Sequence, residues 1–158
     1  MAHSLWQVSW LQRFAIGFVA TFVFIVPARS MGTELIGVPP SEIIERYGAP
    51  DRLFVEQTAS DADHFVVFLY ADYRYFYFFE NEVWQMRVDE RSQHSLYGVS
   101  IGDMIENVAF EIGAPEWNRD SGESASFTLS GHDHPLELRV YVDGDGMIYD
   151  IYLYRMDF

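Results

Sequence analysis

Residues 98–115, GVSIGDMIENVAFEIGAP, begin the stretch that decides the fold of this chain, and that stretch continues to Arg155. It follows the same plan as residues 37–50, GVPPSEIIERYGAP. Both segments open with Gly-Val, continue with apolar residues at helical spacing and end in Gly-Ala-Pro. A Gly after a helix adopts a positive φ at little cost, and a Pro soon after it cannot continue the helix. The ordered match predicts one helix-then-strands unit written twice.

The two segments differ in length. Gly37 to Gly48 spans 11 positions and Gly98 to Gly113 spans 15, so the second helix is predicted to be about one turn longer. Its apolar stripe is expected to pack against Trp84, Val140 and Ile151 or their neighbours. The residues of that stripe are Met104, Ile105, Val108 and Ile112.

Strand patterns follow each predicted helix. Alternating or continuous apolar runs predict antiparallel strands, and the Asp143–Gly146 segment, DGDG, predicts a tight hairpin turn. The fold class is therefore α+β, with two tandem αβββ repeats forming one antiparallel sheet and the helices on one face. The repeats cover about residues 36–89 and 97–155. The expected strands lie at 53–55, 65–70, 73–79, 83–88, 126–130, 136–143 and 147–155.

Composition excludes several classes of function. The 158 residues carry a formal net charge of -14, and every basic residue apart from the histidines is Arg. Such a chain repels nucleic acid, because nucleic-acid binding depends on cations that neutralise phosphates. The chain has no Cys, which excludes disulfides, thiolate metal sites and a Cys nucleophile. A basic protein partner fits the charge, although the acidity also serves solubility alone.

Residues 1–30 differ from the rest of the chain. They contain no acidic residue, and residues 14–26 are continuously apolar or small. Ala28 and Ser30 fit the small-x-small pattern of a signal-peptidase site. The alternative is an uncleaved membrane anchor with Trp6 and Trp10 at the interface, although the apolar run is short for a span. Either interpretation places the domain of residues 31–158 outside the cytoplasm, in the periplasm or secreted, and the anchor interpretation adds membrane contact through residues 1–30.

The Gly-Val, Gly-Ala-Pro and aromatic-strand pattern over about residues 37–155 resembles a known tandem repeat. It is similar to the β-lactamase-inhibitor protein fold and to small outer-membrane assembly lipoproteins of the BamE (SmpA/OmlA) type. The chain lacks the Cys that carries the lipid in the lipoproteins. The resemblance implies a non-enzymatic, extracytoplasmic domain that binds proteins.

The sequence gives only weak signals for catalytic or metal-binding residues. His132, Asp133 and His134 offer imidazole and carboxylate ligands, but adjacent residues before a strand are more typical of an exposed turn. Asp143 and Asp145 sit in a calcium-like DGDG segment that lacks the further ligands of such a loop. We therefore predict no catalytic residue, no metal site and no cofactor, and we do not expect an enzyme.

Tyrosines at alternate positions give the most informative functional signal. Alternate residues of a strand point to opposite faces, and only one face is needed for the core under the helices. Tyr and Arg are enriched at protein interfaces. The sequence thus predicts a protein–protein interaction module acting as an inhibitor, assembly factor or adaptor, or alternatively a membrane-anchored accessory subunit of a larger complex. A second small core, covered by loops or by another copy of the chain, is the competing explanation of the same residues. The predicted partner-binding residues are Tyr73, Tyr75, Tyr77, Tyr141, Tyr152 and Tyr154.

Overall fold

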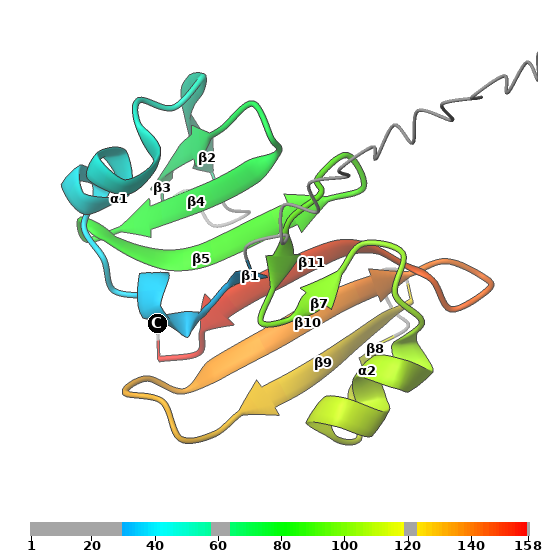
Figure 1. The fold of residues 1–158 in the computed structure, drawn as a ribbon. Helices are drawn as coiled ribbons and strands as arrows, with labels where there is room; N and C mark the ends of the chain where they lie inside the picture. Colours follow the sequence, from blue (N-terminus) through cyan, green and yellow to red (C-terminus); the bar gives the residue numbers. More distant parts are fainter. Residues whose placement is uncertain (1–29, 58–63, 119–122, 158) are drawn as a thin grey trace, which may run out of the picture.

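A computed structural model describes residues 30–57, 64–118 and 123–157. In these residues the chain forms an α+β fold around one large antiparallel sheet of eight strands, in the order β2-β3-β4-β5-β11-β10-β9-β8 (Figure 1). The central pair is β5 and β11, so the two halves of the chain meet in the middle of the sheet. The strands are β2 (Arg52–Gln57), β3 (His64–Leu69), β4 (Arg74–Phe79), β5 (Glu82–Asp89), β8 (Glu116–Asn118), β9 (Ser124–Leu129), β10 (Leu136–Val142) and β11 (Ile148–Arg155).

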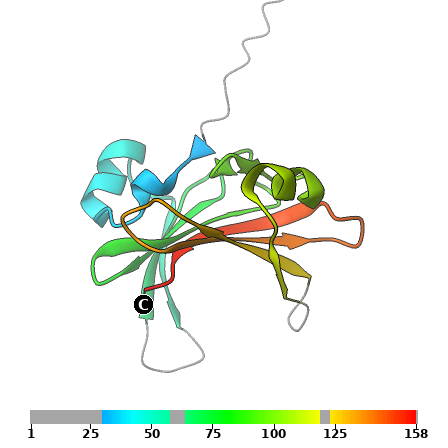
Figure 2. The ribbon, with the colours of Figure 1, turned by 90° about the horizontal axis from the view of Figure 1, so that it is seen from below.

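Two helices and a small second sheet complete the described part of the fold. Both helices lie on the same side of the large sheet (Figure 2). The small sheet has the order β1-β6-β7 and lies on that side too (Figure 2). Among the described residues, no helix has the length and apolar content needed to cross a membrane. These elements are β1 (Ser30–Met31), the 3-10 turn η1 (Thr33–Leu35), α1 (Pro40–Tyr47), β6 (Ser95–Leu96), β7 (Val99–Ser100) and α2 (Ile105–Ile112).

Each helix has recognisable start and stop signals. Pro40 lies in the first turn of α1, where its missing N–H leaves no hydrogen bond unmade. Glu42 forms an ion pair with Arg46 one turn later. Gly48 and Gly113 end the two helices with φ values of 82° and 127°, which residues with a Cβ rarely adopt.

The main core lies between the helices and the sheet. Ile43 of α1 is fully buried, and Ile105 and Val108 of α2 are nearly so. They pack in one cluster with alternate residues of the central strands, as the alternation in β10 and β11 predicts. The strand residues include Phe76, Phe78, Met86, Val88, Leu138, Val140, Ile151 and Leu153.

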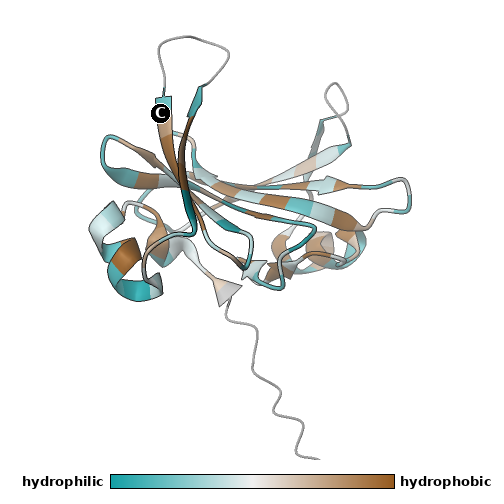
Figure 3. Cartoon of the chain, turned by 90° about the horizontal axis from the view of Figure 1, so that it is seen from above, coloured by the Kyte–Doolittle hydropathy of each residue, from teal (hydrophilic) through white to brown (hydrophobic). Residues whose placement is uncertain are grey.

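The sheet is strongly curved. The free ends of β2 and β3 and those of β8 and β9 bend away from the helices, so the face opposite the helices is concave (Figures 2 and 3). The twist and the two register shifts, one in β4–β5 and one in β10–β11, accompany this curvature. We call this concave surface the open face.

Two predictions about the repeating unit are wrong in detail. Each helix is followed by four strands of the large sheet rather than three, because β2 after α1 and β8 after α2 also pair into it. The helices have equal length, eight residues each. The four additional residues of the second segment form β7 and the turn that precedes Ile105 instead of a further helical turn.

The predicted helix stripe is correct only in part. Ile105 and Val108 are buried, whereas Met104 precedes the helix and is exposed. Trp84 does not lie under α2. The β4–β5 register shifts between Tyr77 and Phe78, which pair with Gln85 and Val83, so Trp84 has no direct partner and joins the opposite face.

Candidate binding face

The aromatic half of the open face is built by β2 to β5. Val67, Tyr75 and Tyr77 form a second, smaller cluster that is almost completely buried. Tyr75 is 6% exposed and Tyr77 is 4% exposed. Burial raises the pKa of Tyr77 to about 12, with a smaller contribution from Glu56. The partly buried residues packed on this cluster are Phe54, Phe65, Leu69, Tyr73 and Trp84.

This burial changes what Tyr75 and Tyr77 can do. Their side chains point to the predicted face, but they leave little surface for a partner. The aromatic half thus matches the competing explanation, a second small core. Tyr73 differs from them because it is partly exposed and has a φ of 61°, with the Arg91 guanidinium 4.3 Å from its ring centroid.

The polar half of the open face is built by β9 to β11. Tyr141, Tyr152 and Tyr154 lie there and are each partly exposed. The rings of Tyr141 and Tyr152 are 5.7 Å apart between centroids. Tyr149 joins them, with its ring 6.3 Å from Tyr141, because the register shift in β10–β11 leaves it without a direct partner. Strict alternation from Tyr152 and Tyr154 would place Tyr149 on the opposite face of the sheet, so the pattern could not identify it.

Arg87 joins the two halves at the seam between β5 and β11. Its guanidinium donates two hydrogen bonds to Asp150, at 2.9 and 2.7 Å. It also lies over the rings of Tyr75 and Tyr152, at 5.1 and 5.2 Å from their centroids. Burial alone would lower the pKa of Arg87, but the hydrogen bonds and charge of Asp150 outweigh burial and raise that pKa. Arg87 is therefore held in place between two tyrosines from different halves.

Glu137 organises the polar half in the same way. It accepts hydrogen bonds from Ser126 at 2.6 Å, from Arg139 at 2.8 Å and from the Tyr154 hydroxyl. Burial raises the pKa of this carboxyl, but the three hydrogen bonds together lower it below its ordinary value. Arg139 in turn lies 5.2 Å from the Tyr154 ring centroid. Three partly exposed side chains thus share one fixed carboxylate.

A second carboxylate closes the end of the seam. Asp89 is buried and accepts a 2.8 Å hydrogen bond from the Tyr75 hydroxyl. Arg91 donates to the same carboxylate, from its backbone N–H and its guanidinium. A cavity of about 320 Å³ opens beside these groups, lined by Arg87, Asp89, Glu90, Arg91, Tyr149 and Asp150.

The histidine segment lies away from the open face. His132 packs edge-on against Tyr97, and His134 Nδ1 lies 3.5 Å from an Asp157 oxygen. Within the described ranges, no group of three or more His, Asp or Glu side chains is placed to hold a metal ion. The predicted segment of residues 1–30 lies, except for Ser30, outside the described residues.

No family model and no curated protein matches the chain. The fold itself is known from other proteins. A cysteine-rich secretory protein from Staphylococcus aureus subsp. aureus Mu50 superposes with a TM-score of 0.54 and 11% identity, over 83% of this chain and 48% of its own. An extracellular protein containing an SCP domain, from Bacillus anthracis str. Ames, superposes with a TM-score of 0.55 and 14% identity, over 95% of this chain and 50% of its own. This chain thus spans about half the length of the structures that it matches.

These neighbours correct the resemblance drawn from sequence. The assignment to BamE-like or β-lactamase-inhibitor-like proteins is wrong, since the structures found are those of proteins of the SCP type. The loose Gly-Val and Gly-Ala-Pro pattern describes helix ends, which many unrelated α+β folds need. At this level of identity, the likeness shows the fold alone.

Proposed function

We propose that this chain is a non-enzymatic protein-binding module that docks its partner on the polar half of the open face. The observation that carries the proposal is a set of three partly exposed tyrosines. Two of them donate hydrogen bonds to carboxylates, Tyr152 to Asp150 and Tyr154 to Glu137, and the third, Tyr141, packs against Tyr152. Tyr141, Tyr152 and Tyr154 supply ring surface, while Asp150 and Glu137 hold Arg87 and Arg139 among them. Tyr and Arg of this kind contribute most to binding at protein interfaces.

The polar half of the open face is more rigid than a loop, which favours it as a docking surface. The tyrosines stand on the central strands β10 and β11, whose backbones are paired on both sides. The arginines are already ordered by their carboxylates, so docking immobilises few additional rotamers. The concave shape also allows a convex partner element to contact both ends of the sheet.

A location outside the cytoplasm supports the same role. The neighbours are a secretory and an extracellular protein, and residues 14–30 have the composition of a signal peptide or anchor.

We also propose that the two halves are copies of one unit, with four strands each. Each half consists of a helix followed by four strands, and the last strand of each half, β5 or β11, lies at the centre of the sheet. This shared order supports the proposal.

The decisive experiment compares Tyr152→Ala with Phe110→Ala. Native extracts, both soluble and membrane fractions, are passed over the immobilised wild-type domain, and the captured protein is identified. Calorimetry with that protein is expected to show Tyr152→Ala weakening binding by more than about 1 kcal/mol. Phe110, 92% exposed on α2, is the matched control and is expected to change binding little. Normal binding by a folded Tyr152→Ala variant would exclude the open face as the docking surface.

The second candidate is a membrane-anchored accessory subunit tethered by residues 1–30. The apolar run at residues 14–26 favours it if that run is retained in the mature protein. N-terminal sequencing of the native protein separates the two. A start near Met31 supports the free module, and an intact Met1 supports the tethered subunit.

A further inference from the structure

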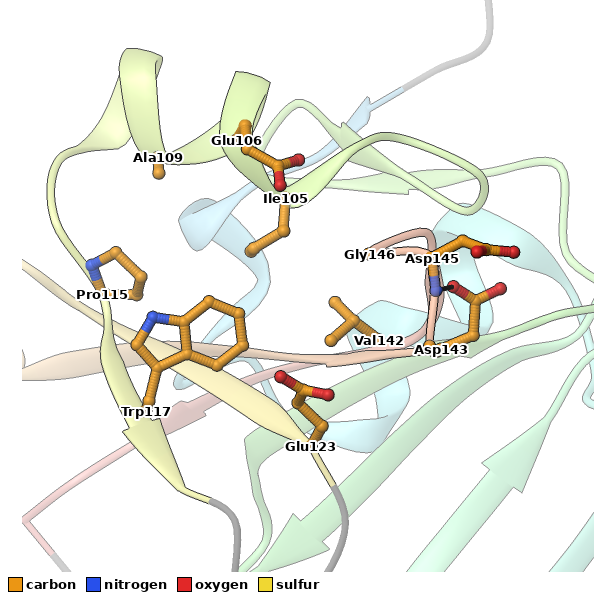
Figure 4. Close-up of a pocket in the computed structure, with 11 residues that line it drawn as sticks. Ile105, Glu106, Ala109, Pro115, Trp117, Glu123, Val142, Asp143, Asp145 and Gly146 are labelled. Carbon is orange, nitrogen blue, oxygen red and sulfur yellow. Dashed lines mark hydrogen bonds between the residues drawn. The ribbon is translucent and has the colours of Figure 1, made fainter.

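A second pocket lies on the helix side of the sheet, away from the open face. It opens between α2, β8 and the β10–β11 turn and has a volume of about 400 Å³ (Figure 4). That volume lies in the lower part of the range of about 300–1,000 Å³ found for ligand pockets. Its apolar lining comes from Ile105, Ala109, Pro115, Trp117 and Val142. Trp117 is 45% exposed, so part of this residue is accessible to a ligand.

Four carboxylates surround this apolar lining: Glu106, Glu123, Asp143 and Asp145 (Figure 4). None of the four forms an ion pair with an Arg or His of the described residues. The described arginines that form ion pairs all do so with other acids. Among the described residues, the pocket therefore combines an apolar wall with carboxylates that no Arg or His pairs.

Part of this charge is fixed in position. Asp143 Oδ1 accepts hydrogen bonds from the backbone N–H groups of Asp145 and Met147, at 3.0 and 2.9 Å. These bonds hold the turn and keep the Asp143 carboxylate at the pocket. Glu106 stands in the first turn of α2, whose hydrogen bonds fix its backbone. Three of the four carboxylates, those of Glu106, Asp143 and Asp145, consequently come from a helix and a tight turn that are ordered before any ligand arrives.

We propose that this pocket binds an arginine side chain of a polypeptide partner. The aliphatic stem of arginine fits the apolar lining, and its planar guanidinium stacks on Trp and pairs with carboxylates through its fork of N–H donors. A metal ion fits less well, because no described group of three ligands converges there. An anionic ligand would be repelled by the four acids. The pocket is thus a second contact surface, with a specificity separate from that of the tyrosines.

The test is an NMR titration of the ¹⁵N-labelled domain with the peptide acetyl-Gly-Arg-Gly-amide at low ionic strength. The Trp117 indole N–H signal is expected to shift and saturate, while acetyl-Gly-Gln-Gly-amide leaves it unchanged. Glu106→Gln is expected to weaken binding about threefold, within the range for exposed ion pairs. Trp117→Ala is expected to weaken it further, because the stacking surface is lost.

Matched variants show whether binding of the arginine peptide depends on the carboxylates of this pocket. Glu111→Gln removes the same charge from an exposed position on the same helix, outside the pocket lining, and is expected to leave binding nearly unchanged. Equal loss in Glu106→Gln and Glu111→Gln would overturn the proposal in favour of general attraction to an acidic surface. A saturating shift of the same signal with Ca²⁺ at micromolar concentration would replace it with a metal site. No shift with the arginine peptide, or tighter binding of acetyl-Gly-Lys-Gly-amide in the same titration, would also refute it.

Discussion

The two halves of the open face use the same residue type for different purposes. In β2 to β5, the tyrosines are packed under other rings, and Tyr75 and Tyr77 are nearly inaccessible. In β9 to β11, the tyrosines remain partly exposed, and two of them, Tyr152 and Tyr154, donate hydrogen bonds to carboxylates. The first arrangement resembles a small core, and the second resembles a prepared contact surface.

Neighbouring residues explain this difference. Trp84, placed on the open face by a register shift, packs its ring 4.7 Å from that of Phe65 and helps cover the aromatic half. The polar half has Ser126, Glu137 and Arg139 in the corresponding region. These groups form hydrogen bonds with one another, and the Arg139 guanidinium that lies over the Tyr154 ring leaves this ring partly exposed. A run of tyrosines therefore does not reveal an interface until the side chains that cover it are known.

The largest expected contrast is between Tyr77→Ala and Tyr141→Ala. Tyr77 is buried among aromatic rings, so its truncation leaves a cavity and should cost about 3–5 kcal/mol of unfolding free energy. Tyr141 is partly exposed, and its loss should cost less than about 1 kcal/mol. Urea denaturation measures both. Equal costs would mean that the two halves are not distinct.

The next effect concerns the seam that joins the halves. Asp150→Asn leaves the half-buried Arg87 without its ion pair and should destabilise the fold by about 2 kcal/mol, below the values for fully buried pairs. Arg46→Met breaks the exposed pair with Glu42 and serves as the control, with an expected change under about 0.5 kcal/mol. A negligible effect of Asp150→Asn in the same denaturation assay would show that Arg87 does not hold the halves together.

Acid should weaken both halves, by a smaller amount. The pKa of Asp89 in the first half and that of Glu137 in the second are both lowered, because hydrogen bonds from Arg91 and Tyr75, and from Ser126, Tyr154 and Arg139, outweigh burial. The unfolded chain then binds more protons than the folded one. The contribution of these two carboxylates to the free energy of unfolding is fully present above their unfolded pKa values of about 4. It is lost as the pH falls through their lower pKa values in the folded protein.

Variants of one carboxylate at a time measure how much each half contributes to the loss of stability in acid. Glu137→Gln and Asp89→Asn should each flatten part of the fall in thermal midpoint measured between pH 6 and pH 2. An unchanged pH profile in both variants would contradict the assigned hydrogen bonds.

The smallest expected effect is on the free edge of the first half. Leu53 is 62% exposed on edge strand β2, so Leu53→Ser should change the unfolding free energy by no more than about 0.5 kcal/mol. Val67→Ser on neighbouring β3 is the contrasting variant, because Val67 is fully buried. A large loss in Leu53→Ser would indicate that another chain covers this edge in solution, which a concentration series would reveal.

Local patterns predicted most of the elements and the direction of the tyrosines. Gly48, Gly113 and the DGDG turn have their own backbone reasons, so the helix ends and the last hairpin could be read from sequence. Period-two alternation placed Val140 and Ile151 in the core and Tyr141 and Tyr152 opposite them. The seven longer strands and both helices were therefore predictable.

The site itself depended on pairings that alternation does not contain. Arg87 meets Tyr152 only because β5 pairs with β11, and a single sequence does not determine that strand order. The register shifts moved Trp84 and Tyr149 by one position each, which reversed the side of the sheet that they face. The pocket beside Trp117 also required β8, a three-residue strand too short to leave a pattern.

The central position of β11 has a consequence for how this chain is made. β11 is the last described strand to leave the ribosome, yet it lies between β5 and β10. Until it arrives, β5 presents an unpaired edge during synthesis, which invites pairing with other chains. Joining Asp89 to Asp150 also closes a long loop, and such distant pairings slow folding. The β5 edge stays exposed until β11 has been made and has paired with it.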